Sequence, residues 1–189
     1  GNTRSLSKAF EKIGLETVIS ADPALILQAK GIVLPGVGAF PKAMASLEER
    51  GLIEPLLAAV AQGTPLLGIC LGMQLLFDTS FEHGETKGLG LIPGQVLPFP
   101  KENQLRIPHM GWNTMAENGD NPHPVLQGIT KNKNGSLLDF YFVHSFVFQC
   151  KDTKHVAGWC DYGGDFTAMV AKDNMIGTQF HPEKSQQAG

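Results

Sequence analysis

The amino-acid sequence predicts an α/β fold of three layers, with a mostly parallel, twisted central sheet, helices on both faces and a β-rich second half. Helical and strand patterns alternate through the first third of the chain, as in doubly wound sheets. After about Gly84, short β-rich segments separated by Gly, Pro and Asn take over. The 189 residues are 42% hydrophobic, enough for one substantial core, so we expect a single domain over residues 1–189.

The alternating part opens with a helix. Asn2 is a candidate N-cap, apolar residues follow at helical spacing from Leu6 to Ile13, and Gly14 ends the pattern. The next elements are predicted to be a strand, a helix begun by Asp22-Pro23, a strand, two helices and a strand. They cover Glu16 to Ser20, Asp22 to Lys30, Gly31 to Leu34, Ala39 to Glu49, Ile53 to Gln62 and Pro65 to Ile69.

The second half is predicted to be mostly β. Its strands are expected at Leu89 to Phe99, Asp139 to Phe148, His155 to Tyr162, Phe166 to Ala171 and Ile176 to Phe180. A helix at the start of an α/β alternation normally follows a strand, and the chain stops soon after the strand that leads to His181. We therefore expect that the domain lacks a first β-strand and a C-terminal helix.

Composition excludes several classes of partner. The net charge is −3 and no basic run interleaves with aromatic residues, so no nucleic-acid binding is expected. No apolar stretch approaches the roughly 20 residues needed to cross a bilayer, so no membrane segment is expected. The three cysteines form no Cys-x-x-Cys pair, which argues against a disulfide framework or a zinc knuckle and favours a cytoplasmic location.

The segment Gly68-Ile69-Cys70-Leu71-Gly72 is the most informative. An apolar strand runs into Gly-x-Cys-x-Gly and then into a helical pattern, as in the nucleophile elbow of hydrolases. Small flanking residues are needed because the nucleophile sits at a cramped turn. A helix N-terminus would also favour the thiolate. The alternative is that Cys70 is a small core residue.

The segment His181-Pro182-Glu183 supplies a candidate base and its orienting carboxylate. A strand delivers His181, and Glu183 lies two residues on, where it can reach the imidazole. Read alone, His-x-Glu is also compatible with a solvated turn or with two metal ligands. No further cluster with ligand spacing accompanies it, so no metal is expected. The other histidines are expected to be surface groups at 83, 109, 123 and 155, and a satisfied strand residue at His144.

Pro35-Gly36-Val37-Gly38, after another strand, is a candidate oxyanion loop. Its two glycines let backbone N–H groups turn toward a cleft, and the expected donors are the N–H groups of Val37 and Leu71. A phosphate-binding loop lacks support because neither the Walker lysine nor Gly-x-Gly-x-x-Gly spacing is present. An ordinary glycine turn stays open as the alternative.

These three segments, in this order and each after a strand, resemble the class I (triad) glutamine amidotransferase family. The resemblance covers nearly the whole chain. The Pro-Gly-Val-Gly-Ala-Phe loop, Pro108 to Asn113, Tyr141 to Ser145 and His181 to Ser185 are similar to the members that make ammonia for imidazole glycerol phosphate synthesis.

The resemblance implies a reaction and a partner. Glutamine is hydrolysed to glutamate through a thioester on Cys70, with His181 as base and Glu183 orienting it. The ammonia passes to a separate (β/α)8-barrel cyclase subunit of a heterodimer, which makes imidazole glycerol phosphate for histidine biosynthesis. No cofactor is implied. A hypothesis follows for the loop at Val37: its carbonyl, in place of its N–H, faces the cleft until the partner's ligand binds.

The resemblance also implies roles for further residues. Gly36, Gly38, Gln74 and Glu82 would hold the glutamine, and Ser145 and Phe146 would approach its carboxylate through backbone groups. Family members usually carry tyrosine where this chain has Phe146. The residues that match the face docked on the cyclase are Asn2, Trp112, Tyr141 and Lys184. From their own patterns these four are a helix cap, a half-buried aromatic, a strand aromatic and a solvated lysine.

Three other functions stay open at this point. One is another class I amidotransferase, and the second is a γ-glutamyl hydrolase or cysteine peptidase with the same elbow. The third is a catalytically silent regulatory module of the same fold.

Overall fold

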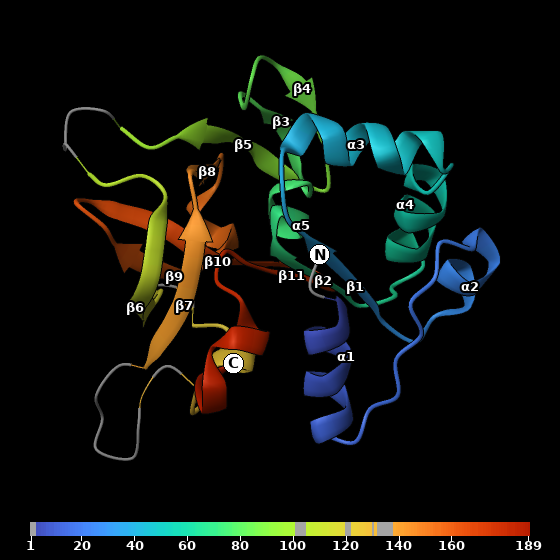
Figure 1. The fold of residues 1–189 in the computed structure, drawn as a ribbon, viewed down its shortest axis with the longest axis horizontal. Coiled ribbons are helices and arrows are strands. Elements are labelled where there is room, and N and C mark those ends of the chain that lie inside the picture. The colour runs from blue at the N-terminus through green and yellow to red at the C-terminus, as the bar shows by residue number, and fades with distance from the viewer. Residues whose placement is uncertain (1–2, 101–104, 120–121, 130, 132–137) are drawn as a thin grey trace.

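Figure 1 shows the computed structural model, which describes residues 3–100, 105–119, 122–129, 131 and 138–189. Asn2, the predicted cap and interface residue, lies outside these described residues. The fold is built from a helix-rich first part and a strand-rich second part, which share one long sheet.

The first part follows the predicted alternation closely. Asp22 caps α2 by accepting a 2.9 Å hydrogen bond from the N–H of Ala24, and Gly14 ends α1 with φ +81°. The elements are α1 (Thr3–Lys12), α2 (Pro23–Gln28), β1 (Ile32–Gly36), α3 (Phe40–Glu49), α4 (Ile53–Ala61), β2 (Leu66–Cys70) and α5 (Leu71–Gln74).

The second part is β-rich, as predicted. Its strands are β3 (Phe77–Ser80), β4 (Thr86–Lys87), β5 (Ile92–Pro98), β6 (His109–Glu117), β7 (Asp139–His144), β8 (Phe146–Cys150), β9 (Val156–Asp161), β10 (Asp165–Lys172) and β11 (Met175–Thr178). Short 3₁₀ turns cover Pro124–Leu126, Thr153–His155, Pro182–Lys184 and Gln186–Ala188. None of the helices in the described part of the chain is long and apolar enough to cross a membrane.

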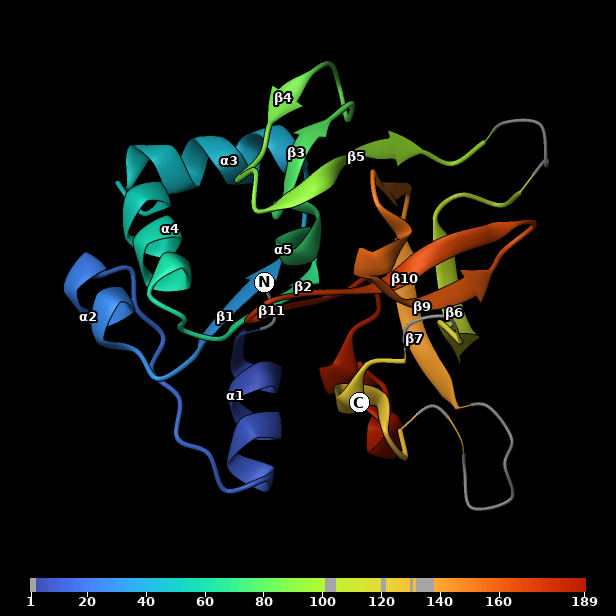
Figure 2. The ribbon, with the colours of Figure 1, turned by 180° about the vertical axis from the view of Figure 1, so that it is seen from behind.

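Two sheets organise these strands. The larger has the order β1-β2-β11-β10-β9-β6-β7, in which β1, β2 and β11 are parallel and the remaining neighbours are antiparallel. The smaller has the order β4-β3-β5-β8. The parallel strands of the larger sheet therefore form the α/β part of the fold. The other strands of the second half lie beyond it, in the larger and the smaller sheet (Figure 2).

Helices cover both faces of the parallel strands, which confirms the three layers. Leu6 of α1 packs with Val33 and Ile69 on one face. On the other face Phe40 of α3 and Val60 of α4 pack with the strands in the largest core. Because successive strand residues point to opposite faces, both layers are filled from the same short strands.

The predicted strand at Glu16 to Ser20 is wrong. This segment has no regular secondary structure, and Val18 and Ile19 are 81% and 68% exposed. β1 is the edge of the described sheet, and the segment pairs with no strand in that part of the chain. A β-prone sequence without a hydrogen-bonded neighbour does not form a strand.

Two other differences concern the second half. The predicted strand Asp139 to Phe148 is two strands, because the chain leaves the larger sheet after His144 and joins the smaller one at Phe146. The structure also adds β6, which pairs with β7 and β9 although it contains Gly111 and Asn113. Residue Ser145 is thus the junction between the two sheets.

Candidate active site

Cys70 occupies a sharp turn between β2 and α5. Its backbone has φ +54° and ψ −114°, a conformation that a non-glycine residue adopts only when its surroundings force it. A Cβ on Gly72 would lie 1.7 Å from the carbonyl oxygen of Leu34, and one on Gly68 would lie 2.7 Å from the Cα of Met73. The predicted crowding of a nucleophile elbow is therefore confirmed.

The helix after the elbow is short. α5 contains only the four residues from Leu71 to Gln74, all buried, and the chain then turns into β3. The aligned peptide dipoles of one helical turn are few, so the helix contributes less to thiolate stabilisation than the sequence pattern predicted.

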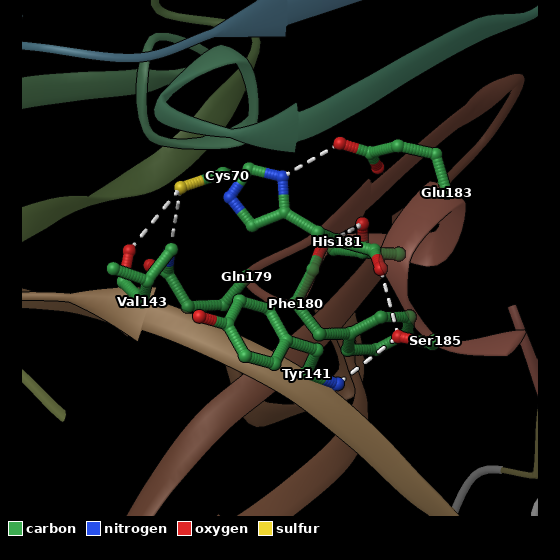
Figure 3. Close-up of polar contacts among 9 residues, drawn as sticks. Cys70, Tyr141, Val143, Gln179, Phe180, His181, Glu183 and Ser185 are labelled. Atoms are coloured by element: carbon green, nitrogen blue, oxygen red, sulfur yellow. Dashed lines mark hydrogen bonds and ion pairs between the residues drawn. The ribbon is translucent and has the colours of Figure 1, made fainter. Parts of the chain in front are cut away.

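Besides the imidazole of His181, the Cys70 sulfur has two polar neighbours. Its thiol donates toward the carbonyl oxygen of Val143, with an S···O distance of 3.8 Å, and Gln179 Nε2 lies 3.5 Å from Sγ (Figure 3). Val143 belongs to β7, and Gln179 directly follows β11. The two neighbours therefore come from segments that are distant from Cys70 in the sequence.

His181 and Glu183 form a buried pair. Glu183 Oε1 lies 2.9 Å from His181 Nδ1, and the two side chains are 2% and 5% exposed, respectively. The imidazole lies between the Cys70 sulfur and the Glu183 carboxylate (Figure 3). An Nδ1–H that donates to Glu183 leaves Nε2 as the atom that can accept a proton. Within the described residues, Nε2 has no other hydrogen-bond partner.

The electrostatics of this pair fit proton transfer. Burial alone would lower the pKa of His181, but its contacts with the Cys70 thiol and the Glu183 carboxylate outweigh burial and raise the pKa to about 9. Burial alone would raise the pKa of Glu183, but the hydrogen bond from His181 and its charge lower it. The pair therefore favours an imidazolium held against a carboxylate, which a thiolate nucleophile requires.

Backbone contacts hold His181 in place. Its N–H donates to the carbonyl oxygen of Tyr141 at 2.9 Å. The Ser185 hydroxyl donates to the carbonyl oxygen of His181 at 2.7 Å and accepts from the N–H of Tyr141 at 3.0 Å. Pro182 begins a 3₁₀ turn immediately after the imidazole. The base is thus fixed to β7 on one side and to this turn on the other.

The predicted oxyanion loop lies beside the elbow. Gly36 pairs with Cys70 in the β1–β2 register, and a Cβ on Gly36 would be 2.8 Å from the Gly72 nitrogen. Gly38 has φ +102°, and the Val37 side chain is 58% exposed. The loop and the base share one recess, which is lined by Leu6, Pro35, Gly36, Val37, Ile69, His181 and Glu183. The oxyanion role of Val37 and Leu71 stays a prediction.

The predicted substrate residues come from α5, from the segment after β3 and from the junction of β7 and β8. Gln74 is 5% exposed and donates a 2.9 Å hydrogen bond from Nε2 to Gln179 Oε1. Glu82 is buried and its Oε2 accepts a 2.8 Å bond from the N–H of Phe40, the first residue of α3. Ser145, two residues beyond Val143, is the junction between the sheets, and Phe146 begins β8. Their contact with glutamine stays a prediction.

A buried histidine pair was missed by sequence analysis. The prediction that His109 is a surface group is wrong: it is 3% exposed, and its Nδ1 lies 3.0 Å from His144 Nε2. His144 Nδ1 is 2.8 Å from the Phe146 carbonyl oxygen, and Asn113 Nδ2 is 3.2 Å from His109 Nε2. His144 is a satisfied strand residue, as predicted. Pairing across β6 and β7 brings His109 inside, and no local pattern reports this.

The three hydrogen bonds that link Asn113, His109, His144 and Phe146 form together only when both imidazole rings are neutral. The carbonyl of Phe146 requires an Nδ1–H on His144, so His144 Nε2 accepts from His109 Nδ1–H, and His109 Nε2 accepts from Asn113. Burial lowers the pKa of His109 to about 4 and that of His144 to about 3. This series of hydrogen bonds ends at the carbonyl of Phe146, in the segment predicted to approach the substrate carboxylate.

Three of the predicted interface residues lie together. Trp112, 49% exposed, and Tyr141 pack edge to face with ring centroids 6.0 Å apart, and Lys184 Nζ lies 5.6 Å from the Tyr141 ring centroid. Tyr141 also accepts the His181 N–H. One hydrogen bond, from the His181 N–H to the Tyr141 carbonyl oxygen, therefore links this cluster to the candidate base.

Among the described residues, the other titratable groups form no second centre. Burial raises the pKa of Cys150 and of Cys160 to about 12, so both are unreactive thiols at neutral pH. No group of three or more His, Cys, Asp or Glu side chains in the described part of the chain is arranged to hold a metal ion.

An α/β sheet that presents a cysteine at a nucleophile elbow, beside a buried His–Glu pair, defines the class of cysteine-dependent triad hydrolases. The chain belongs to the class I glutamine amidotransferase family, whose model, described as "Glutamine amidotransferase class-I", matches residues 1–189.

Similar proteins agree with this family. "Imidazole glycerol phosphate synthase subunit HisH" of Desulfitobacterium hafniense is 49% identical over 189 residues, covering 100% of this chain and 85% of the relative. The protein of the same name from Geobacter sulfurreducens is 46% identical over 194 residues, covering 100% and 90%. A crystal structure of a glutamine amidotransferase shares the fold, with a TM-score of 0.75 at 19% identity, covering 100% of this chain and 89% of that one.

Proposed function

We propose that this chain is the glutaminase subunit of imidazole glycerol phosphate synthase, acting in histidine biosynthesis as a single domain. The observation that carries the glutaminase assignment is the convergence of Cys70 with the buried His181–Glu183 pair in a class I amidotransferase fold. The relatives that are 46% to 49% identical over the whole chain support the particular enzyme.

The first half of the reaction forms a thioester. His181 Nε2 takes the Cys70 proton, and the sulfur attacks the side-chain amide carbon of glutamine. The resulting oxyanion would be held by the N–H groups of Val37 and Leu71. When the tetrahedral intermediate collapses, its C–N bond breaks and His181 returns the proton to the departing nitrogen, releasing ammonia and leaving a γ-glutamyl thioester on Cys70.

The second half restores the enzyme. His181 removes a proton from water, and the water oxygen attacks the thioester carbon. The C–S bond breaks, glutamate leaves and the proton returns to the sulfur. Glu183 stays ionised throughout and stabilises the imidazolium that forms in each half-reaction, which agrees with its lowered pKa.

The ammonia is delivered to a (β/α)8-barrel cyclase that docks on the face carrying Trp112, Tyr141 and Lys184. Aromatic side chains such as the exposed Trp112 and the half-buried Tyr141 are enriched in interface cores. The link from Tyr141 to the His181 N–H supports the idea that docking acts on the active site. The three free cysteines are compatible with a reducing cytoplasm.

The central experiment labels Cys70 with a glutamine-analogue electrophile and measures glutaminase activity with and without the cyclase and its nucleotide. We expect stoichiometric labelling at Cys70, activity that rises on adding both components, and no activity in Cys70→Ala. Cys150→Ala is the matched control and keeps its activity, because the pKa of that thiol is raised to about 12.

Two results would refute the assignment. Glutamine hydrolysis that persists in Cys70→Ala removes the proposed nucleophile. The proposed partner is removed if a pull-down finds no complex with the cyclase and if the chain alone shows full glutaminase activity that the cyclase does not change. The glutaminase chemistry would then remain intact.

A further inference from the structure

Gln179 is a fully buried amide whose two ends are both engaged in the candidate active site. Its side chain is 0% exposed, its Nε2 lies 3.5 Å from Cys70 Sγ, and its Oε1 accepts the 2.9 Å bond from Gln74 Nε2. Its backbone N–H donates to the carbonyl oxygen of Ala168 at 2.9 Å. The side-chain amide therefore lies between α5 and the sulfur, and the backbone of this residue is fixed to β10.

The neighbours of the sulfur determine which end of this amide faces it. A thiol has one proton, and the carbonyl oxygen of Val143, 3.8 Å from Sγ, is an acceptor that cannot become a donor. Whether the thiol proton is directed to Val143 or to the imidazole of His181, no proton is left for the Gln179 amide, which therefore has to be a donor. Nε2 of Gln179 meets this requirement, and Gln74 satisfies the Oε1 that points away.

We propose that Gln179 donates a hydrogen bond to the Cys70 thiolate, and that Gln74 is a positioning residue that holds the Gln179 amide in the donating orientation. The proposal deepens the glutaminase assignment and rests on Cys70 being its nucleophile.

Deprotonation makes this contact more important. When His181 takes the thiol proton, the bond to Val143 is lost and that carbonyl becomes an unfavourable neighbour for negative sulfur. The Gln179 N–H stays and strengthens, because hydrogen bonds to charged acceptors are stronger than neutral ones. The four-residue α5 offers little dipole stabilisation of the thiolate. A side-chain hydrogen-bond donor therefore adds stabilisation that the elbow alone does not supply.

The test measures the pKa of the Cys70 thiol without substrate. The rate of iodoacetamide alkylation is followed against pH, and the adduct on the Cys70 peptide is quantified by mass spectrometry in the full chain. Gln179→Met removes the donor at similar volume, and we expect the thiol pKa to rise by about one unit. Glutaminase kcat/KM at neutral pH should fall roughly tenfold. Gln149→Met is the matched control, since Gln149 is exposed on β8, and it should shift neither.

Gln74→Glu tests the positioning role. It replaces the donor to Gln179 Oε1 with acceptors, so the Gln179 amide should invert and present its oxygen to the sulfur. The thiol pKa should then rise although Gln179 is intact, which loss of substrate contact would not cause. The new carboxylate also raises the thiol pKa by its charge, so the rise that Gln74→Glu adds to Gln179→Met measures that charge alone and should be smaller than the rise it causes in the wild-type chain.

Each outcome decides the proposal. An unchanged thiol pKa in folded Gln179→Met, or in Gln74→Glu, overturns it and leaves Gln179 a packing residue. If circular dichroism shows that Gln179→Met does not fold, Gln179→Glu keeps the size and should raise the pKa further, because a carboxylate then faces the sulfur. Failure of the wild-type chain to hydrolyse glutamine would instead refute the proposed function.

Discussion

Glu183 holds the imidazole of His181 through one 2.9 Å hydrogen bond, and both side chains are buried. Glu183→Gln keeps the shape and removes the charge, so the pKa of His181 should fall and the imidazolium should lose its stabilisation. We expect kcat to drop by roughly 10²- to 10⁴-fold with a smaller change in KM. Steady-state kinetics with glutamine and an NMR titration of His181 measure both effects.

Glu48→Gln is the control for this prediction, since Glu48 is exposed on α3 and its substitution should leave kcat unchanged. A Glu183→Gln protein with wild-type kcat would show that the carboxylate is structural only.

Two isoleucines show how exposure separates similar side chains. Ile69 is 2% exposed and packs with Leu6 between α1 and the sheet, whereas Ile19 is 68% exposed. Ile69→Ala should lower the free energy of unfolding by roughly 2–5 kcal/mol, and Ile19→Ala by less than about 0.5 kcal/mol. Urea unfolding of both variants checks this. Equal losses would contradict the layer arrangement on this face.

The elbow is an element whose geometry depends on missing side chains. Gly72→Ala would place a Cβ 1.7 Å from the Leu34 carbonyl oxygen, so β1 and α5 would have to separate. We expect loss of the folded state or a melting temperature lowered by at least about 5 °C. Gly119→Ala is the matched control, because a Cβ there meets nothing within 4 Å. A normal melting temperature for Gly72→Ala would contradict the tight contact.

Local sequence patterns predicted the elements that depend on neighbours along the chain. The Gly-x-Cys-x-Gly turn, the Asp22 cap and the His181–Glu183 pair each lie within a few residues, and all were found where expected. Gln179 was missed because its contact with Cys70 joins residues 109 positions apart. The wrong strand at Glu16 to Ser20 has the same origin, since strand formation depends on a neighbour in space.

The whole protein should be most stable near pH 6.5. The pKa values of His109 and His144 are lowered to about 4 and about 3. The unfolded chain therefore binds more protons than the folded chain below pH 6.5, and stability decreases as the pH is lowered. The pKa of His181 is raised to about 9. Its contribution is complete below pH 6.5 and is lost as pH rises toward 9. The acid loss should be on the order of 2 kcal/mol per neutral histidine between pH 7 and pH 5.

Urea midpoints measured from pH 5 to pH 9 check this profile. His109→Gln can keep both side-chain hydrogen bonds and should flatten the acid side only. Glu183→Gln should flatten the alkaline side only. An acid side that stays equally steep in His109→Gln would show that other groups cause the loss.

The passage of the chain from one sheet to the other at Ser145 has a consequence for protein engineering. β7 carries the Val143 carbonyl to the sulfur, and β8, which starts one residue after Ser145, is the edge of the other sheet. A chimera between this chain and a relative that has its crossover point at residue 145 would mix two sheet geometries at the candidate substrate site. Crossovers at Gly119 or Gly163, outside both sheets, would instead exchange β7 and β8 as one unit.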